Sequence, residues 1–586
     1  MFIVKIPVLS APRRLLLCPL LILLLGGCVA SDHESVSVDT LYLNAALYDV
    51  TTGATSAKAF AVSDTDIVFV GSAEEARRTL TAATTIDLGG RFVMPGIIDS
   101  HAHPGLVALI GELEDPDAGL PTDTKENFFS ALSDYAELLK DEPLVVLGSW
   151  DVAMFLPDGP NKRDLDAIFP DQPVVLTDNS GHSTWMNSVA LAMFGVTKDT
   201  KDLSPGVSVF ARDESGEPTG WVKEFTLMRQ IGKTLLRPAP EIKSRLQYYL
   251  SYLSEHGVTT LWDAGNFEND DEIYAVLQEM EQEGTLPVKY EGSYHIFDPA
   301  QIDKAIAELL RLRESYGGKR LQFNSIKVHY DGVVEVGTAG MLDSYIIEED
   351  NRGGFLFTAE RLAEFLLQLD EHDIDIHLHS VGDGATREIL DAVEMVQDRG
   401  TKLGIEVTIS HLEHVSEDDF PRFAELSVHA NFTPHWWGGT YFGDAGERYV
   451  GAEAIHRSQD GRALFERDAN VTFCSDVTTL SAHHRANPFV GIQMAVTRQE
   501  FDLGPDANVF GPESARVTRE QAIAAYTING ARQLGRESEI GSIEVGMQAD
   551  FLVLPESLLT RETYSIAQLK PDAVFLNGTA VAGTPR

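Results

Sequence analysis

The chain has 586 residues, of which 44% are hydrophobic and 23% charged, proportions that are ordinary for a folded protein with a large core. Its charge is unusual, because 46 basic residues are outnumbered by 89 acidic ones and the formal net charge is −43. Nucleic-acid binding needs a basic surface, so this balance argues against a nucleic-acid partner. The acid excess favours a well-solvated surface and carries no information about an active site.

The first 27 residues have the pattern of a secretion signal. Basic residues come first, and the apolar stretch that follows, Leu15–Leu25, is shorter than the roughly 20 residues needed to span a bilayer. Small residues then precede Cys28, which resembles the signal of a bacterial lipoprotein. The resemblance implies cleavage before Cys28 and a lipid anchor on its thiol, at the bacterial cell envelope, in the periplasm or on the outer surface. The alternative is plain secretion, with Cys28 incidental.

The mature chain would begin with a polar tether and would contain two cysteines, Cys28 and Cys474. With Cys28 lipidated, no disulfide can form within the chain, so stability must come from the core. No later segment of the sequence is long and apolar enough to be a transmembrane helix.

Both ends of the mature chain have a β-rich pattern. Short β runs separated by turns occupy Thr40–Leu88, and the same pattern returns in Ile543–Leu554 and Ala573–Val581. Between them, strand-like segments alternate with amphipathic helices, which is typical of parallel β/α units. The two ends therefore predict a small β-sandwich that is formed from both chain ends.

The middle of the chain predicts eight parallel strands, the number that closes an α/β barrel of the TIM type, (β/α)8. The predicted strands are Phe92–Asp99, Thr259–Ala264, Val288–Tyr294, Ser325–Tyr330, Ile374–His379, Glu406–Ser410, Val428–Thr433 and Val471–Ser475. Two further apolar runs, Leu144–Leu147 and Pro173–Leu176, follow the first strand and predict an inserted subdomain over the barrel mouth. A second insertion at 436–460, rich in Gly and aromatic residues, is expected to form a lid.

This architecture divides the chain into a signal peptide, a tether, a barrel with an insertion, and two parts of a sandwich. The predicted bounds are 1–27 for the signal peptide, 28–39 for the tether, 40–91 and 536–586 for the sandwich, and 92–535 for the barrel with its insertion at 104–245. Function in such a barrel is placed at the carboxyl ends of the strands, so the polar residues there are the candidate site.

The first predicted strand ends in Asp99-Ser100-His101-Ala102-His103. Residues i and i+2 of an extended chain point to the same side, so His101 and His103 can converge on one ion of the zinc type. Two solvent-facing histidines in a loop are the alternative, but the apolar run that precedes them favours a metal site.

Four later strands also carry residue types that bind metals. Lys327 lies between apolar residues, so it must be deprotonated, modified or paired, for example with Asp331. The fifth and sixth strands offer two histidines each, between which spacing does not choose: His377 or His379, and His411 or His414. Asp476 follows the eighth strand. Five strand ends in barrel order with such residues indicate a metal centre rather than isolated structural histidines.

These residues and their surroundings resemble the amidohydrolase superfamily. The motifs PGIIDSHAH, HSVGD, LEH and CSD, and the tail AYTINGARQLG, are similar to the family 3 branch that includes N-substituted formamide deformylases. The resemblance extends over 40–582 and implies the same barrel and two-ended sandwich. It also implies His379 and His414 as the ligands on the fifth and sixth strands, and a carbamylated Lys327 that bridges two metals.

One or two divalent metal ions are therefore expected, with zinc as the default. The resemblance implies the metal ligands His101, His103, Lys327, His379, His414 and Asp476. The metal would activate a water molecule, and Asp476, as the catalytic residue, would take the proton of that water and deliver it to the leaving nitrogen. An uncarbamylated Lys327 would leave a site with one metal.

Further residues concern the substrate. His182 follows Ser180-Gly181 in the insertion and is expected to bind the substrate carbonyl, or else to be a surface histidine in a polar loop. Trp150 is expected to be a wall of the substrate pocket, or else a core residue. His411 and His377 stand where an Arg and an apolar residue are expected in relatives, so the substrate pocket is expected to differ from theirs.

The predicted function is metal-dependent hydrolysis of a C–N bond in an amide, formamide or N-acyl small molecule. The same activated water would attack a lactone, a carbamate or a dipeptide, so these are alternative substrates. A third hypothesis is a lipoprotein that binds a small molecule without catalysis, although such a protein does not need Asp476 beside five other ligands. The sequence leaves the oligomeric state open.

Overall fold

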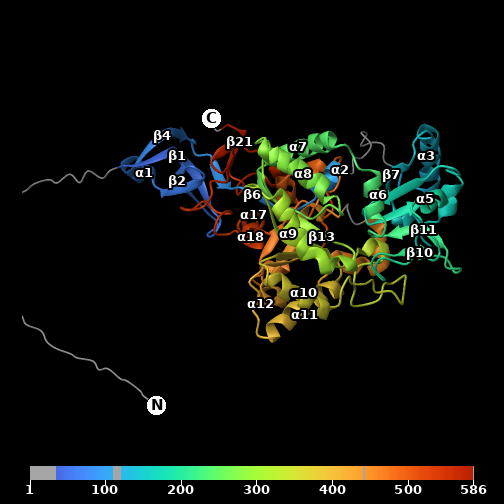
Figure 1. Cartoon of the computed structure of the whole chain (residues 1–586). Coiled ribbons are helices and arrows are strands. Elements are labelled where there is room, and N and C mark those ends of the chain that lie inside the picture. The colour runs from blue at the N-terminus through green and yellow to red at the C-terminus, as the bar shows by residue number, and fades with distance from the viewer. Residues whose placement is uncertain (1–34, 110–119, 440–442, 585–586) are drawn as a thin grey trace, which may run out of the picture.

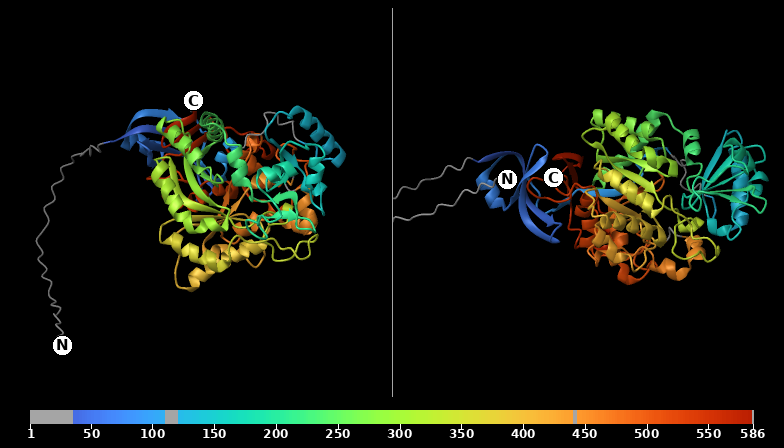
Figure 2. Two further views of the ribbon diagram at one scale, coloured as in Figure 1. Left: turned by 45° about the vertical axis from the view of Figure 1, so that its right-hand side comes forward. Right: turned by 60° about the horizontal axis from the view of Figure 1, so that its bottom comes forward.

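The computed structural model describes residues 35–109, 120–439 and 443–584. The predicted signal peptide and Cys28 lie outside the described residues. Figures 1 and 2 show three structural units in a row: a sheet that contains both chain ends, a barrel in the middle, and the sheet of the insertion on the far side. Within the described ranges, every helix is too short or too polar to cross a bilayer.

Both chain ends form one mixed sheet, which confirms the prediction that they fold together. The strand order is β21-β20-β19-β5-β1-β2-β3, with β4 paired to β1. Phe551 pairs with Pro95 in an antiparallel ladder, so the C-terminal strands continue the N-terminal sheet. The elements are β1 (Val36–Asp49), β2 (Ala54–Ser63), β3 (Asp66–Gly71), α1 (Ala73–Thr79), β4 (Leu80–Asp87), β5 (Phe92–Pro95), β19 (Phe551–Leu554), β20 (Ala573–Leu576) and β21 (Thr579–Gly583).

Eight parallel strands form the barrel and confirm the predicted fold class. In sheet order they are β6 (Ile97–Ala102), β12 (Val258–Asp263), β13 (Lys289–Ile296), β14 (Leu321–His329), β15 (Asp375–Ser380), β16 (Val407–His411), β17 (Val428–Phe432) and β18 (Val471–Phe473). The first and last strands are joined through side chains. Ser100 Oγ donates to the carbonyl of Phe473 at 2.8 Å, and the Ser475 N–H donates to Asp99 at 2.9 Å. These bonds nearly close the barrel.

Helices surround the barrel and bury their apolar faces against the strands. They are α2 (Pro104–Leu109), α7 (Ala239–Glu255), α8 (Asp270–Gln282), α9 (Ala305–Tyr316), α10 (Ala359–Asp370), α11 (Asp383–Asp398), α12 (Phe420–Leu426), α15 (Gly461–Phe465), α16 (Pro488–Thr497), α17 (Arg519–Ala525) and α18 (Ile528–Gln533). In α10, Leu362, Leu366 and Leu369 are buried on one face, as their spacing predicts. Thr518 and Gln521 form a capping box at the start of α17.

The first predicted barrel strand is divided between two sheets, which corrects the predicted strand Phe92–Asp99. Residues up to Pro95 belong to the terminal sheet as β5, and β6 of the barrel begins at Ile97. Gly96 lies between them, where a Cβ atom would come within 2.2 Å of Thr259 Oγ1. A continuous apolar run hides this change of partner, because both sheets bury the strand completely.

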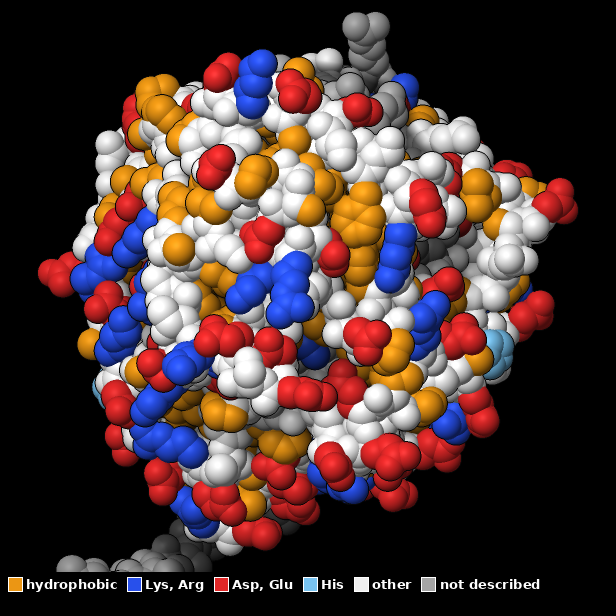
Figure 3. Space-filling view, turned by 90° about the vertical axis from the view of Figure 1, so that its right-hand side faces the viewer, with side chains coloured by type: hydrophobic (Ala, Val, Ile, Leu, Met, Phe, Trp, Pro, Cys, Tyr) orange, Lys and Arg blue, Asp and Glu red, His pale blue; other side chains and the backbone are white. Residues whose placement is uncertain are grey.

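The insertion contains a second sheet of five strands, in the order β10-β11-β9-β8-β7. The two additional apolar runs of the sequence are its strands β7 (Val145–Trp150) and β8 (Val174–Asp178). The other elements are α3 (Lys125–Leu138), α4 (Lys162–Asp166), β9 (Ser183–Met186), α5 (Ser188–Met193), β10 (Phe210–Arg212), β11 (Pro218–Lys223) and α6 (Met228–Thr234). Figure 3 views the molecule from this side and shows acidic and basic side chains interspersed over the face.

The segment after β17 packs against the insertion. It contains α13 (Gly443–Val450) and α14 (Ala452–Arg457). Ala445 and Tyr449 of α13 belong to the same apolar core as Val152 and Trp185 of the insertion. This segment therefore extends the insertion's core, and both lie beside the barrel.

Candidate metal centre

Most of the predicted ligands lie at the carboxyl ends of the barrel strands. His101 is the last residue but one of β6, and His103 follows that strand directly. Lys327 and His329 are near the end of β14, and His377 and His379 are near the end of β15. All of these side chains are buried. Their strands belong to one nearly closed parallel barrel, so the carboxyl ends of the strands, and these side chains with them, lie at the same rim.

The first ligand group consists of His101, His103 and Asp476, whose ligand atoms all lie within 4.8 Å of one another. Asp476 Oδ1 is 3.2 Å from His103 Nε2 and 3.5 Å from His101 Nε2. Burial alone would raise the pKa of Asp476, but a hydrogen bond to His103 and the nearby His411, His103 and Lys327 lower it to about 2. The carboxylate is therefore ionised. It is held in a left-handed backbone conformation with φ of 50°, which is uncommon for residues other than glycine.

Lys327 lies beside the first group and forms no ion pair with a carboxylate among the described residues. Its Nζ is 3.4 Å from His101 Nε2 and 3.5 Å from Ser410 Oγ. Burial lowers the pKa of Lys327 to about 7, although Asp476 opposes this effect. Asp331, the alternative partner, instead accepts hydrogen bonds from the N–H groups of two loops and lies 2.9 Å from His379 Nδ1.

The two histidines of β15 have different partners. His377 Nε2 is 3.0 Å from His101 Nδ1, and the His377 ring is stacked on Trp262 with 4.0 Å between the centroids. A histidine that binds a metal through one nitrogen is commonly oriented by a hydrogen bond at the other. His377 therefore orients a predicted ligand, a role that sequence reasoning missed. The sequence did carry one signal for this role, because His377 stands at a position where relatives are expected to have an apolar residue.

The histidines of the sixth barrel strand are also separated. His411 Nδ1 is 3.3 Å from Asp476 Oδ2, and the His411 ring is stacked on Trp436. The Nε2 atom of His414 is buried without a hydrogen-bond partner, and His414 belongs to neither ligand group of the described chain. The structure therefore places His411, rather than His414, against the first group. A ligand role for His414 stays a prediction.

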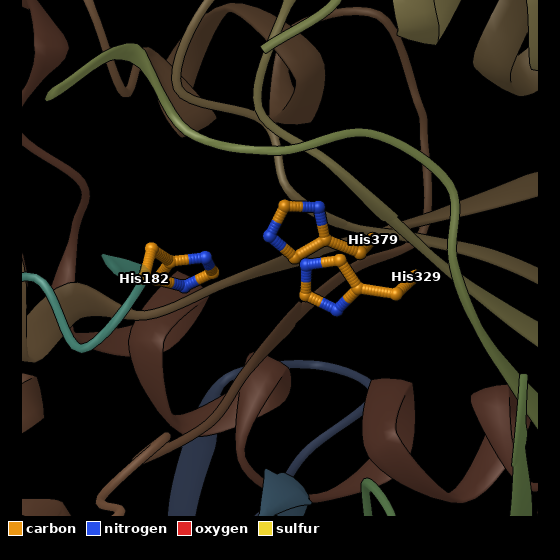
Figure 4. A group of neighbouring side chains, drawn as sticks. All are labelled: His182, His329 and His379. Atoms are coloured by element: carbon orange, nitrogen blue, oxygen red, sulfur yellow. The ribbon is translucent and has the colours of Figure 1, made fainter. Parts of the chain in front are cut away.

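A second ligand group consists of His182, His329 and His379, again with all ligand atoms within 4.8 Å of one another. Figure 4 shows the three rings facing a common region. His182 comes from the turn between β8 and β9 of the insertion, so this loop does reach the barrel mouth. His329 was not predicted, although it stands two residues after Lys327, the same spacing that identified His101 and His103.

Trp150 lies in the core of the insertion, the alternative that the sequence left open. Its side chain is fully buried, and its Nε1–H donates to the carbonyl of Leu176 at 3.2 Å. Phe155 and Trp185 pack against it edge-on. Trp150 therefore packs in the core of the insertion, and its role as a wall of the substrate pocket stays a prediction.

The residues at this rim have the donor types that a divalent metal requires. Imidazole nitrogens and a carboxylate oxygen are the ligands of catalytic zinc sites. One ring nitrogen of His103 and one of His329, residues that belong to the two ligand groups, are buried and have no hydrogen-bond partner among the described residues. Unpaired buried polar atoms are costly, so their concentration at one place indicates a bound group. The site therefore fits a metal ion.

A TIM-type barrel with histidine-rich ligand groups at the carboxyl ends of its strands defines the protein as a metal-dependent hydrolase. Residues 84–582 match the model of the amidohydrolase family, which is most of the chain, and the protein belongs to that family.

Individual relatives are distant. The chain is 28% identical to the exoenzymes regulatory protein AepA of Pectobacterium carotovorum subsp. carotovorum, over 71% of this chain and 89% of that protein. It is 23% identical to the N-substituted formamide deformylase of Arthrobacter pascens, over 92% of this chain and 97% of that protein. Its fold is similar to that of an uncharacterized metal-dependent hydrolase from Pyrococcus furiosus, with a TM-score of 0.61, 23% identity, and 89% and 100% coverage.

Proposed function

We propose that the protein hydrolyses a C–N bond in a small amide, formamide or N-acyl compound. The observation that carries this proposal is the group of His101, His103 and Asp476, in which an ionised carboxylate contacts two buried imidazoles. The similarity to an N-substituted formamide deformylase over nearly the full length of both chains supports the type of bond.

His101, His103 and Asp476 would hold a divalent ion, with zinc favoured by the nitrogen and oxygen donors. When bound, such an ion supplies a Lewis acid and lowers the pKa of a nearby water molecule. Asp476 accepts a proton from the attacking water and passes it to the leaving nitrogen, because its low pKa keeps it ionised. His377 fixes the His101 ring through the 3.0 Å contact between their nitrogens.

Lys327 is the residue for which the protonation state matters most. Its pKa of about 7 leaves a substantial fraction of neutral amine at neutral pH, and only a neutral amine can react with carbon dioxide to form a carbamate. We propose that this modification occurs. Mass spectrometry under native conditions, before and after acidification, would detect a labile addition of one carbon dioxide. Its absence at every carbon dioxide concentration would contradict carbamylation.

The experiment that tests the function is a substrate panel with zinc-loaded protein. The panel should contain N-formyl and N-acetyl amines together with a lactone, a carbamate and a dipeptide. Preferred turnover of the N-formyl or N-acetyl compounds is expected. Preferred turnover of the lactone, carbamate or dipeptide would show that the protein hydrolyses a different carbonyl compound. Stoichiometric binding of a compound without turnover of any member of the panel would favour a binding protein.

We also propose that the protein is anchored to the bacterial cell envelope through a lipid on Cys28. The support is the sequence alone, in which small residues precede this cysteine after a short apolar stretch. Expression in a bacterial host with a radiolabelled fatty acid tests the anchor. Label on the wild type and none on Cys28→Ser is expected, whereas a soluble, unlabelled wild type would contradict it.

A further inference from the structure

Three imidazoles at the barrel rim form a second group, separate from His101, His103 and Asp476. They come from three segments that are far apart in the sequence: His182 from the insertion, His329 from β14 and His379 from β15. All three side chains are at least four-fifths buried. Figure 4 shows the three rings gathered around a common region.

The orientation of His379 is set by Asp331. His379 Nδ1 is 2.9 Å from Asp331 Oδ1, which also accepts the Val381 N–H at 3.1 Å. The other carboxylate oxygen accepts the N–H groups of Gly340 and Gly382. With Nδ1 committed to this carboxylate, the lone pair of His379 is on Nε2, the nitrogen available to a ligand.

His182 has the same arrangement, with Glu224 as its partner. His182 Nδ1 is 2.7 Å from Glu224 Oε2, and this carboxylate is completely buried. Glu224 Oε1 accepts hydrogen bonds from the Thr338 hydroxyl and the Val333 N–H, both in the loop after β14. Glu224 therefore orients His182 and also connects the insertion to the barrel. Its position leaves Nε2 of His182 as the available nitrogen.

His329 completes the group. Its ring is stacked on that of His379 with 3.9 Å between centroids and 27° between planes, and its Nε2 has no hydrogen-bond partner in the described structure. Imidazoles that are oriented by carboxylates at the opposite nitrogen, as His182 and His379 are here, are the arrangement found around protein-bound zinc.

We infer that His182, His329 and His379 bind a second divalent cation, and that this cation holds the insertion against the barrel. The ligand set differs from the one implied by the family resemblance, in which Lys327 and His414 accompany His379. In this structure His414 lies outside the group, and His182 and His329 take part instead. Binding of this cation can be measured whichever bond the protein hydrolyses.

Zinc content of dialysed full-length protein tests the ligand set. Variants His182→Ala and His329→Phe should each contain one equivalent less than the wild type, while His414→Ala should keep the wild-type content. Circular dichroism checks that each variant is folded, and His182, with a side chain that is 20% exposed against 8% for His329, is the substituted residue less enclosed by the core. If His414→Ala lost one equivalent of zinc and His182→Ala kept the wild-type zinc content, the inference would be overturned. A wild-type protein that binds only one equivalent of zinc would also overturn it.

Zinc affinity tests the role of the carboxylate that orients His182. Glu224→Gln should weaken binding of the second equivalent about 10- to 100-fold, the usual effect of losing such a partner. Glu406→Gln is the matched control, because Glu406 Oε2 also contacts a histidine, His429, at 2.6 Å but lies outside both groups. The control should bind zinc as the wild type does. Equal affinities for both variants would contradict the inference.

Hydrogen exchange tests the connection between the two structural units. Zinc should slow exchange of the backbone amides around His182 in the wild type, since the ion would join the insertion to β14 and β15. The same amides in His329→Phe should not respond, although the substituted residue is in the barrel. A zinc response that is equal in both proteins would show that the ion does not link the two units.

Discussion

His377 Nε2 lies 3.0 Å from His101 Nδ1, so a histidine on the fifth barrel strand orients a predicted metal ligand on the first. This contact fixes the nitrogen that His101 presents to Asp476 and Lys327, both of which lie near its Nε2 atom. The His377 ring is in turn held by stacking on Trp262. His377 and Trp262, which are not members of the first ligand group, therefore fix the orientation of one of its members.

Replacing His377 tests this support. His377→Leu should weaken zinc binding at the first group about 10- to 100-fold, because His101 loses the hydrogen bond that sets its orientation. A zinc titration with a competing chelator measures the change. His377→Gln, which retains a polar group, should recover part of the affinity. Wild-type affinity in the leucine variant would show that His377 only fills space.

Asp476→Asn should abolish most turnover while preserving the fold. The amide cannot accept the proton, and general acid–base groups contribute about 10²- to 10⁴-fold to rate. Steady-state kinetics on the best substrate of the panel, together with a thermal melt, measure both effects. A variant with the wild-type kcat would remove Asp476 from the mechanism.

The pKa of Lys327 predicts how the stability of the metal-free protein depends on pH. Burial lowers this pKa from 10.5 to about 7, so between these values the unfolded chain binds a proton that the folded chain lacks. Stability should therefore rise as pH increases from 7 to 10, with a limiting contribution of roughly 5 kcal/mol, since one pKa unit corresponds to about 1.4 kcal/mol. Chemical unfolding of the wild type and of Lys327→Met, in buffer free of carbon dioxide, should show a steeper rise of stability with pH in the wild type, because other buried groups contribute equally to both proteins. Parallel pH profiles would contradict the assignment.

Gly96→Ala should destabilise the protein, because the added Cβ would lie 2.2 Å from Thr259 Oγ1, where the chain passes from the terminal sheet into the barrel. A loss of about 1–3 kcal/mol is expected for forced overpacking of this kind. Gly404→Ala is the control, since its new atom would meet only ordinary contact at 3.5 Å. Denaturant unfolding measures both, and equal stabilities would show that β6 can shift without cost.

The strand count and the His-x-His pair could be predicted because both depend on local pattern. Eight apolar segments with polar residues at their ends are visible in the sequence, and His101 and His103 are two residues apart. The division of the first strand at Gly96 could not be predicted, since a fully buried run looks the same in one sheet or two. His329 was missed even though it repeats the i, i+2 spacing with Lys327.

The roles of the remaining histidines depend on tertiary contacts. His377 and His379 are both buried on β15, but only the folded barrel shows that one contacts His101 and the other Asp331. His411 reaches Asp476 from a left-handed backbone conformation with φ of 77°, which the sequence does not indicate. Strand spacing identifies which residues can meet at the rim, and side-chain packing decides which of them do.

The central claim is that residues from distant parts of the chain assemble one metal centre at the barrel rim. A crystal structure of the zinc-loaded protein, with diffraction data collected on both sides of the zinc absorption edge, tests it most directly. We expect an anomalous peak in contact with His101, His103 and Asp476. Fully loaded crystals with no peak at these three residues would contradict it.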